Sequence, residues 1–101
     1  MKVENMTSSS GNKIANQFII TGIAAGIYNK EGQHLQSGKM FQSYDSIIAY
    51  KAHTGTLYLD KDYWDYSRTT SKYRNQFTRL DTQSTKKGIE AGTIKLLTFN
   101  S

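Results

Sequence analysis

The sequence contains no cysteine and no proline. The lack of cysteine excludes disulfides and thiolate metal sites, and it is typical of a protein that works in a reducing compartment. No apolar run approaches the ~20 residues that a membrane span needs. The first 12 residues have no apolar segment of the kind found in a signal peptide. We therefore expect a cytoplasmic protein with no membrane association.

The sequence also lacks the usual motifs of catalysis. The two histidines, His34 and His53, fall in predicted turns, and neither has a nucleophile elbow beside it. The glycines are scattered and form no phosphate-binding loop. Three Asp lie between residues 60 and 65, without the spacing, the central Gly or the terminal Glu of a calcium loop, so we interpret them as helix caps. The sequence does not decide whether carboxylates that are distant along the chain meet in space to hold two metal ions. We expect no enzymatic activity, no cofactor and no metal.

Positive charge is concentrated in one segment of the chain. The net charge is +5, from 13 Lys and Arg against 8 Asp and Glu. Residues 1–67 hold six of each and sum to zero, whereas residues 68–87 hold six basic residues and one acidic residue. Such a patch attracts phosphates or an acidic protein surface. The alternative is a solvated helix face whose Lys and Arg serve only solubility.

The segment 63–80 holds the only Trp, three of the seven Tyr and all three Arg. Helical spacing from Ser67 places one apolar stripe on this segment, formed by Tyr73, Phe77 and Leu80. The opposite side carries Arg68, Lys72, Asn75 and Arg79. Like charges this close destabilise a lone helix by a few tenths of a kcal/mol per pair, and an anionic partner would remove that cost. The predicted partner-binding residues are Tyr66, Arg68, Lys72, Arg74, Asn75, Arg79, Lys86 and Lys87.

Two modes of nucleic-acid binding fit this segment. Residues 66–75 resemble the turn and recognition helix of helix-turn-helix proteins, in which short hydroxyls and cations near the helix start face the DNA. The departures are a first helix that is too short and the bulky Trp64 and Tyr66 near the turn. The other mode is single-stranded binding, in which bases stack on exposed aromatics beside a cationic groove. The stacking candidates are Tyr44, Tyr58, Tyr63 and Tyr66, while Trp64, Tyr73 and Phe77 are better explained as core.

The remaining patterns predict an α+β fold. Residues 1–12 are predicted to be a flexible polar leader, and residues 13–101 a single domain. Alternating and β-branched patterns predict strands over 17–28, 39–43, 47–51, 56–60 and 93–99, with 47–51 and 56–60 forming a hairpin. Helices are predicted over 60–64, capped by Asp60, and over 67–80, capped by Ser67 or Thr69. A last helix is predicted over 85–91, capped by Thr82 or Ser84 and ending at Gly92. This order predicts a small antiparallel sheet of about four to five strands with two or three short helices on one face.

Residues 41–77 carry a family resemblance. The runs Phe-Gln-Ser-Tyr-Asp-Ser and Tyr-Trp-Asp-Tyr-Ser-Arg-Thr-Thr-Ser-Lys-Tyr-Arg-Asn-Gln-Phe are similar to a family of small uncharacterised proteins of bacteriophages and mobile elements. The resemblance implies a phage or mobile-element setting and a compact single domain, and it gives no activity. The expected location is the host cytoplasm. We therefore predict a basic, non-enzymatic accessory protein that binds nucleic acid, or a host nucleic-acid–protein complex, through a cationic helix. The alternatives are an anti-CRISPR-type inhibitor of a host defence nuclease and a virion or assembly component.

Overall fold

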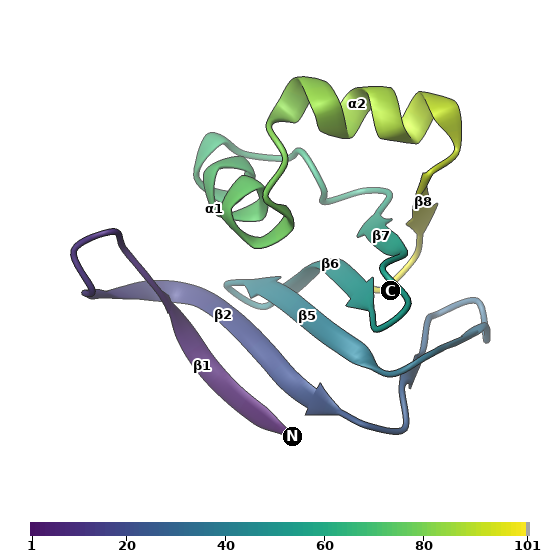
Figure 1. Cartoon of the computed structure of the whole chain (residues 1–101), viewed down its shortest axis with the longest axis horizontal. Helices are drawn as coiled ribbons and strands as arrows, with labels where there is room; N and C mark the ends of the chain where they lie inside the picture. The colour runs from purple at the N-terminus through teal and green to yellow at the C-terminus, as the bar shows by residue number, and fades with distance from the viewer. Residues whose placement is uncertain (101) are drawn as a thin grey trace.

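The computed structural model describes residues 1–100, which form a six-stranded mixed sheet with two helices packed on one face (Figure 1). A separate two-stranded sheet lies at one end. The elements are β1 (Lys2–Thr7), β2 (Lys13–Ile23), β3 (Ile27–Tyr28), β4 (His34–Leu35), β5 (Gly38–Ser43), β6 (Ser46–Ala52), β7 (Leu57–Asp60), α1 (Arg68–Thr78), α2 (Thr82–Ala91) and β8 (Ile94–Leu97). The predicted α+β class is confirmed, and the sheet is larger than predicted.

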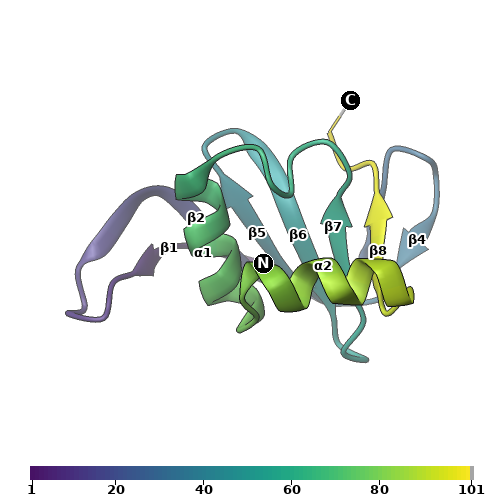
Figure 2. The same ribbon diagram turned by 90° about the horizontal axis from the view of Figure 1, so that it is seen from above.

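The large sheet has the strand order β1-β2-β5-β6-β7-β8. Neighbouring strands are antiparallel except β7 and β8, which are parallel. A parallel pair needs a long crossover connection, and here both helices supply it. The helices therefore cross the sheet between β7 and β8, with α1 over β5 and β6 and α2 reaching β8 (Figure 2). The prediction of a wholly antiparallel sheet is wrong for this reason.

The predicted flexible leader is also wrong, because residues 2–7 form β1. Val3 and Glu4 pair with Ile20 and Ile19 of β2. Met6 is 3% exposed and belongs to the core under the helices. An edge strand takes its stability from main-chain hydrogen bonds to its neighbour and needs few apolar residues of its own. A polar composition therefore did not reveal it.

The core between sheet and helices is built on one row of the sheet. Phe41, Ala49 and Leu59 are paired across β5, β6 and β7, and all three are fully buried. The ring of Phe77 from α1 stacks on Phe41 with a centroid distance of 5.8 Å. Burying each large apolar side chain of this row stabilises the fold by about 1.5–3 kcal/mol. The predicted hairpin of β6 and β7 is confirmed.

The opposite face of the sheet is also covered. Met40, Tyr50 and Tyr58 are paired on this face, and they pack with Leu35 of β4 and with Phe99 near the C-terminus. Fully buried Tyr50 donates a hydrogen bond from its hydroxyl to the Gln36 carbonyl at 2.6 Å. The central strands are therefore buried on both faces, and the helices cover only one of the two.

Asp60 fixes the end of β7, but it does not begin a helix. One carboxylate oxygen accepts from the N–H groups of Asp62 and Tyr63 at 3.1 and 3.0 Å, which closes a turn. The other accepts from the N–H of Phe99 at 2.8 Å and so holds the C-terminal segment against the sheet. This long-range hydrogen bond explains why Asp60 is only 1% exposed. Residues 61–65 form turns, and the helix predicted over 60–64 is absent.

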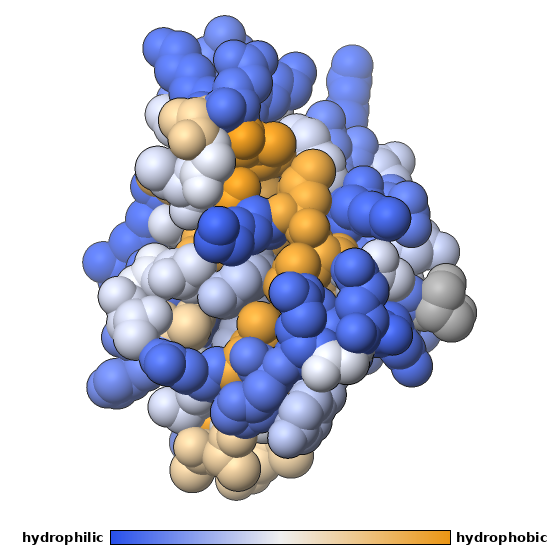
Figure 3. Space-filling view, turned by 90° about the vertical axis from the view of Figure 1, so that its right-hand side faces the viewer, coloured by the Kyte–Doolittle hydropathy of each residue, from blue (hydrophilic) through white to orange (hydrophobic). Residues whose placement is uncertain are grey.

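The sheet has two free edges, β1 and β8. The side of the molecule that carries β8 shows an apolar strip at its centre (Figure 3). Leu96 of β8 is 37% exposed. Within residues 1–100, neither helix has the length or the apolar character needed to cross a membrane.

Candidate anion-binding surface

Helix α1 begins as its sequence predicts. The N-cap Ser67 has extended backbone angles, and its hydroxyl accepts a hydrogen bond from the Thr70 N–H at 3.1 Å. The helix ends one residue before Arg79, which adopts the left-handed conformation with φ 62° and donates its N–H to the Asn75 carbonyl. This turn leads the chain directly into α2.

The solvent-facing side of α1 is cationic. Thr70, Phe77 and Thr78 are among the residues that face the sheet and are buried. Arg68 and Lys72, one turn apart on the opposite side, are exposed. Arg79 at the C-cap is exposed as well. The predicted amphipathic character of the helix is therefore confirmed for these three cations.

Helix α2 adds two more exposed cations, Lys86 and Lys87. Its N-cap is Asp81, and neither of the predicted caps, Thr82 or Ser84, has this role. The Asp81 carboxylate accepts from the Ser84 N–H at 2.7 Å, and this hydrogen bond lowers the pKa of Asp81 below its ordinary value. The helix ends at Gly92 in the left-handed conformation, as predicted.

Arg74 does not belong to the surface, which corrects its predicted role in partner binding. Its side chain has no exposed area. The guanidinium donates to the Trp64 carbonyl and, at 2.9 Å each, to Asn75 Oδ1 and Thr82 Oγ1. It also lies over the Trp64 ring, 5.1 Å from the centroid, and 3.4 Å from Asp65 Oδ1. Burial lowers the pKa of Arg74, and the Asp65 carboxylate opposes that shift.

The contacts of Arg74 join the segment before α1 to the beginning of α2. They also use the side chain of Asn75, which is half-buried and accepts from Arg74. The predicted role of Asn75 in partner binding is therefore corrected as well, because its side chain is already hydrogen-bonded within the fold. Helical periodicity places Arg74 near the apolar stripe, and that position is the signal of its burial.

A hollow at the beginning of α1 brings together two of the predicted residues, Tyr66 and Arg68. Its volume is about 400 Å³, and its lining is Asp65, Tyr66, Ser67, Arg68, Ser71 and Thr82. Tyr66 is 46% exposed and packs edge-on against the Tyr63 ring at 5.3 Å between centroids. The Asp65 carboxylate accepts hydrogen bonds from the Ser71 hydroxyl at 2.8 Å and from the Arg74 guanidinium. This carboxylate is therefore already paired within the fold.

The exposed cations of the helices form no ion pair within residues 1–100, although the Asp81 carboxylate attracts Lys87 from a longer distance. Among residues 1–100, ion pairs form only between Lys2 and Glu4 and between Arg74 and Asp65. Five predicted residues therefore have no carboxylate of the described chain within 4.0 Å: Arg68, Lys72, Arg79, Lys86 and Lys87. We call these five residues the cationic helix surface. Over the same range, no group of three or more His, Cys, Asp or Glu side chains is placed to hold a metal ion.

The helix-turn-helix interpretation is wrong. The element before α1 is the strand β7, followed by turns, and no helix lies there to pack against α1 in the required way. In a helix-turn-helix unit, a first helix crosses the DNA backbone beside the recognition helix. Here α1 packs on the sheet through Phe77 and has no such helix before it.

Comparison with known proteins places this fold in a family. No curated protein and no solved structure matched the chain. The model of a family of unknown function, DUF8033, matches residues 1–93, which span the chain from β1 through α2. The chain therefore belongs to the DUF8033 family.

Proposed function

We propose that this protein is a non-enzymatic nucleic-acid-binding protein that uses the cationic helix surface. The observation that carries the proposal is that five exposed Lys and Arg side chains lie on the two helices and the turn between them, over one face of the sheet, with no carboxylate of residues 1–100 within 4.0 Å. Unpaired cations on one side of a protein attract the phosphates of a nucleic acid from a distance and bind them on contact. A setting in a bacteriophage or mobile element stays a prediction and agrees with this role.

The hollow at the beginning of α1 gives the surface a place for a base. Exposed Tyr66 presents a ring beside Arg68, and the Ser67 and Ser71 hydroxyls line the same hollow. A base stacked on Tyr66 would contribute about 1–3 kcal/mol, and the adjacent phosphate would contact Arg68. This arrangement favours single-stranded nucleic acid, because a duplex keeps its bases stacked inside.

The salt dependence of binding tests this proposal quantitatively. If all five cations contact phosphates, log K falls with log salt at a slope of about −3.5 for a single strand and about −4.5 for a duplex. The Arg68→Ala/Lys72→Ala variant should reduce the slope by about 1.4 for a single strand. Fluorescence anisotropy with labelled DNA and RNA oligonucleotides across a salt series measures both values.

The matched control is Lys13→Ala/Lys30→Ala, which removes the same charge from exposed lysines outside the helices. This variant should keep the slope of the native chain. Absence of salt-sensitive binding contradicts the proposal, and so does an equal loss in the two variants.

A second candidate function is inhibition of a host defence nuclease by direct protein contact. The apolar strip on the β8 side, together with the free β8 edge and half-exposed Leu96, favours it (Figure 3). An affinity pull-down from host lysate, with and without digestion of nucleic acid, separates the two functions. A partner that is retained after digestion and lost with Leu96→Glu supports the inhibitor, whereas loss of every partner after digestion supports nucleic-acid binding.

A further inference from the structure

We infer that a second site, separate from the cationic helix surface, binds the phosphate group of a small ligand in a groove across β5 and β6. The groove has a volume of about 560 Å³ and lies at the end of the sheet where β5 begins and β6 ends. Lys39, Lys51 and His53 line it, together with Thr21 and Gly38. We call it the sheet groove.

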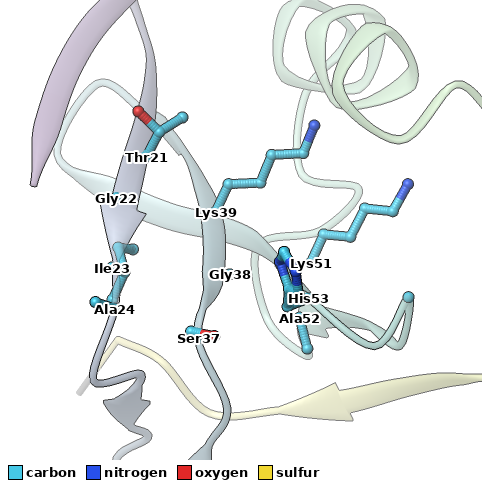
Figure 4. Close-up of a pocket in the computed structure, with 11 residues that line it drawn as sticks. Thr21, Gly22, Ile23, Ala24, Ser37, Gly38, Lys39, Lys51, Ala52 and His53 are labelled. Carbon is cyan, nitrogen blue, oxygen red and sulfur yellow. The ribbon is translucent and has the colours of Figure 1, made fainter.

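The two lysines of the sheet groove are placed directly opposite each other. Lys39 on β5 pairs with Lys51 on β6, so both side chains project from the same face of the sheet. Figure 4 shows the side chains of Lys39 and Lys51 extending in the same direction, toward the helix layer. Like charges directly opposite each other on neighbouring strands destabilise a sheet. An anion between them would remove this repulsion.

Nothing within the described chain neutralises these two charges. Among residues 1–100, no carboxylate lies within 4.0 Å of either ammonium group. Lys39 instead lies over the Phe77 ring at 5.5 Å from the centroid. This contact places the ammonium beside α1 and leaves its charge in place. The exposed imidazole of His53 is a further donor at the same end of the sheet.

The floor of the sheet groove is backbone and small side chains. At Gly38 an added Cβ would lie 2.2 Å from the Lys51 carbonyl oxygen, so the two strands approach each other too closely for any side chain there. Ala24 and Ala52 complete an apolar lining of small side chains beside the lysines. A ligand that fits this lining has a flat, weakly polar body and an anionic end. A nucleoside monophosphate is the simplest probe with both features.

The test uses the full chain labelled for amide NMR, titrated in parallel with adenosine monophosphate, inorganic phosphate, adenosine and a single-stranded oligonucleotide without terminal phosphate. We expect adenosine monophosphate and phosphate to shift the amides of Gly38, Lys51 and His53, and adenosine to leave them unchanged. The oligonucleotide should shift α1 amides and spare the sheet groove. Equal shifts with adenosine, groove shifts with the oligonucleotide, or no response to adenosine monophosphate up to about 10 mM would overturn the inference.

Two variants separate binding from folding. Lys51→Glu should weaken phosphate binding by about tenfold or more, the loss expected when charge-assisted hydrogen bonds are removed. Because it replaces a repulsive cross-strand pair by an attractive one, it should also raise the melting temperature at low salt. Lys51→Gln should weaken binding without reversing the charge. The control Lys13→Ala/Lys30→Ala should bind within about twofold of the native chain.

An equal loss of phosphate binding in that control would overturn the inference, as would native phosphate affinity in both Lys51 variants. The result is independent of the proposed nucleic-acid function. If phosphate does not bind in the sheet groove, the salt slope measured for the cationic helix surface is unaffected. If Arg68→Ala/Lys72→Ala does not alter oligonucleotide binding, the phosphate titration of the sheet groove is unaffected.

Discussion

Replacing Arg74 by Met should strongly destabilise the folded protein, whereas the same change at Arg68 should not. Met is similar in length and apolar, so it can fill the space of the Arg74 stem. The substitution removes the donors of the Trp64 carbonyl, Asn75 Oδ1 and Thr82 Oγ1, and it removes the cation over the Trp64 ring. It also leaves Asp65 without its counter-charge.

The size of the effect follows from these contacts. Each hydrogen bond to a charged group is worth about 1.5–3 kcal/mol, but bonds that share one guanidinium are not additive. The ion-pair partner Asp65 is 40% exposed and stays solvated, so the loss comes from the network of hydrogen bonds to the buried guanidinium, and we expect about 3 kcal/mol for Arg74→Met. Domains of this size have about 5–15 kcal/mol of total stability. The melting temperature should therefore fall by at least about 12 °C.

Urea unfolding followed by the fluorescence of Trp64 measures this loss, since Trp64 is the only tryptophan and contacts Arg74 directly. Arg68→Met is the matched control, because Arg68 is exposed on the same helix and Met has a similar helix propensity. The control should lie within about 0.5 kcal/mol of the native chain. A native urea midpoint for Arg74→Met, or equal losses in the two variants, would refute the assignment of Arg74 as an internal anchor.

Three further predictions concern stability. The pKa of Asp81 is lowered in the folded chain, so the Asp81 carboxylate stabilises the fold above about pH 4, and this stabilisation is lost as pH falls through the lowered pKa. Asp81→Asn should therefore flatten the acid side of a plot of melting temperature against pH. Burial raises the pKa of Tyr50, so above about pH 10 only the unfolded chain ionises at this tyrosine and stability falls. Tyr50→Phe should therefore lose less stability at alkaline pH. An unchanged slope of stability against pH in this range would contradict the prediction. Gly38→Ala should lower the free energy of unfolding, measured by urea titration, by about 1–3 kcal/mol or more, because its Cβ would meet the Lys51 carbonyl.

The parts of the fold that depend on neighbouring residues were predicted well. Ser67 caps α1 and Gly92 ends α2, because capping needs only a short side chain or a left-handed residue at the correct place. The hairpin of β6 and β7 followed from alternation of apolar residues around a turn. Exposure of Arg68 and Lys72 followed from helical spacing alone.

The rest required contacts between distant segments. Asp60 was predicted to cap a helix, but in the structure its carboxylate accepts a hydrogen bond from the N–H of Phe99, 39 residues along the chain. Lys39 and Lys51 lie in a part of the chain with no net charge, so counting charge along the sequence could not find them. Only the pairing of β5 with β6 places Lys39 and Lys51 opposite each other on one face of the sheet.

The sequence by itself determined an α+β chain with a cationic, amphipathic helix, because periodicity and capping act over a few residues. The tertiary structure decided which cations are free. Arg74 is enclosed by the turn before α1 and by the start of α2, while Arg68 and Lys72 of the same helix face solvent. The physical reason is that a buried charge persists only where other segments supply its acceptors, and the positions of those segments depend on the whole fold.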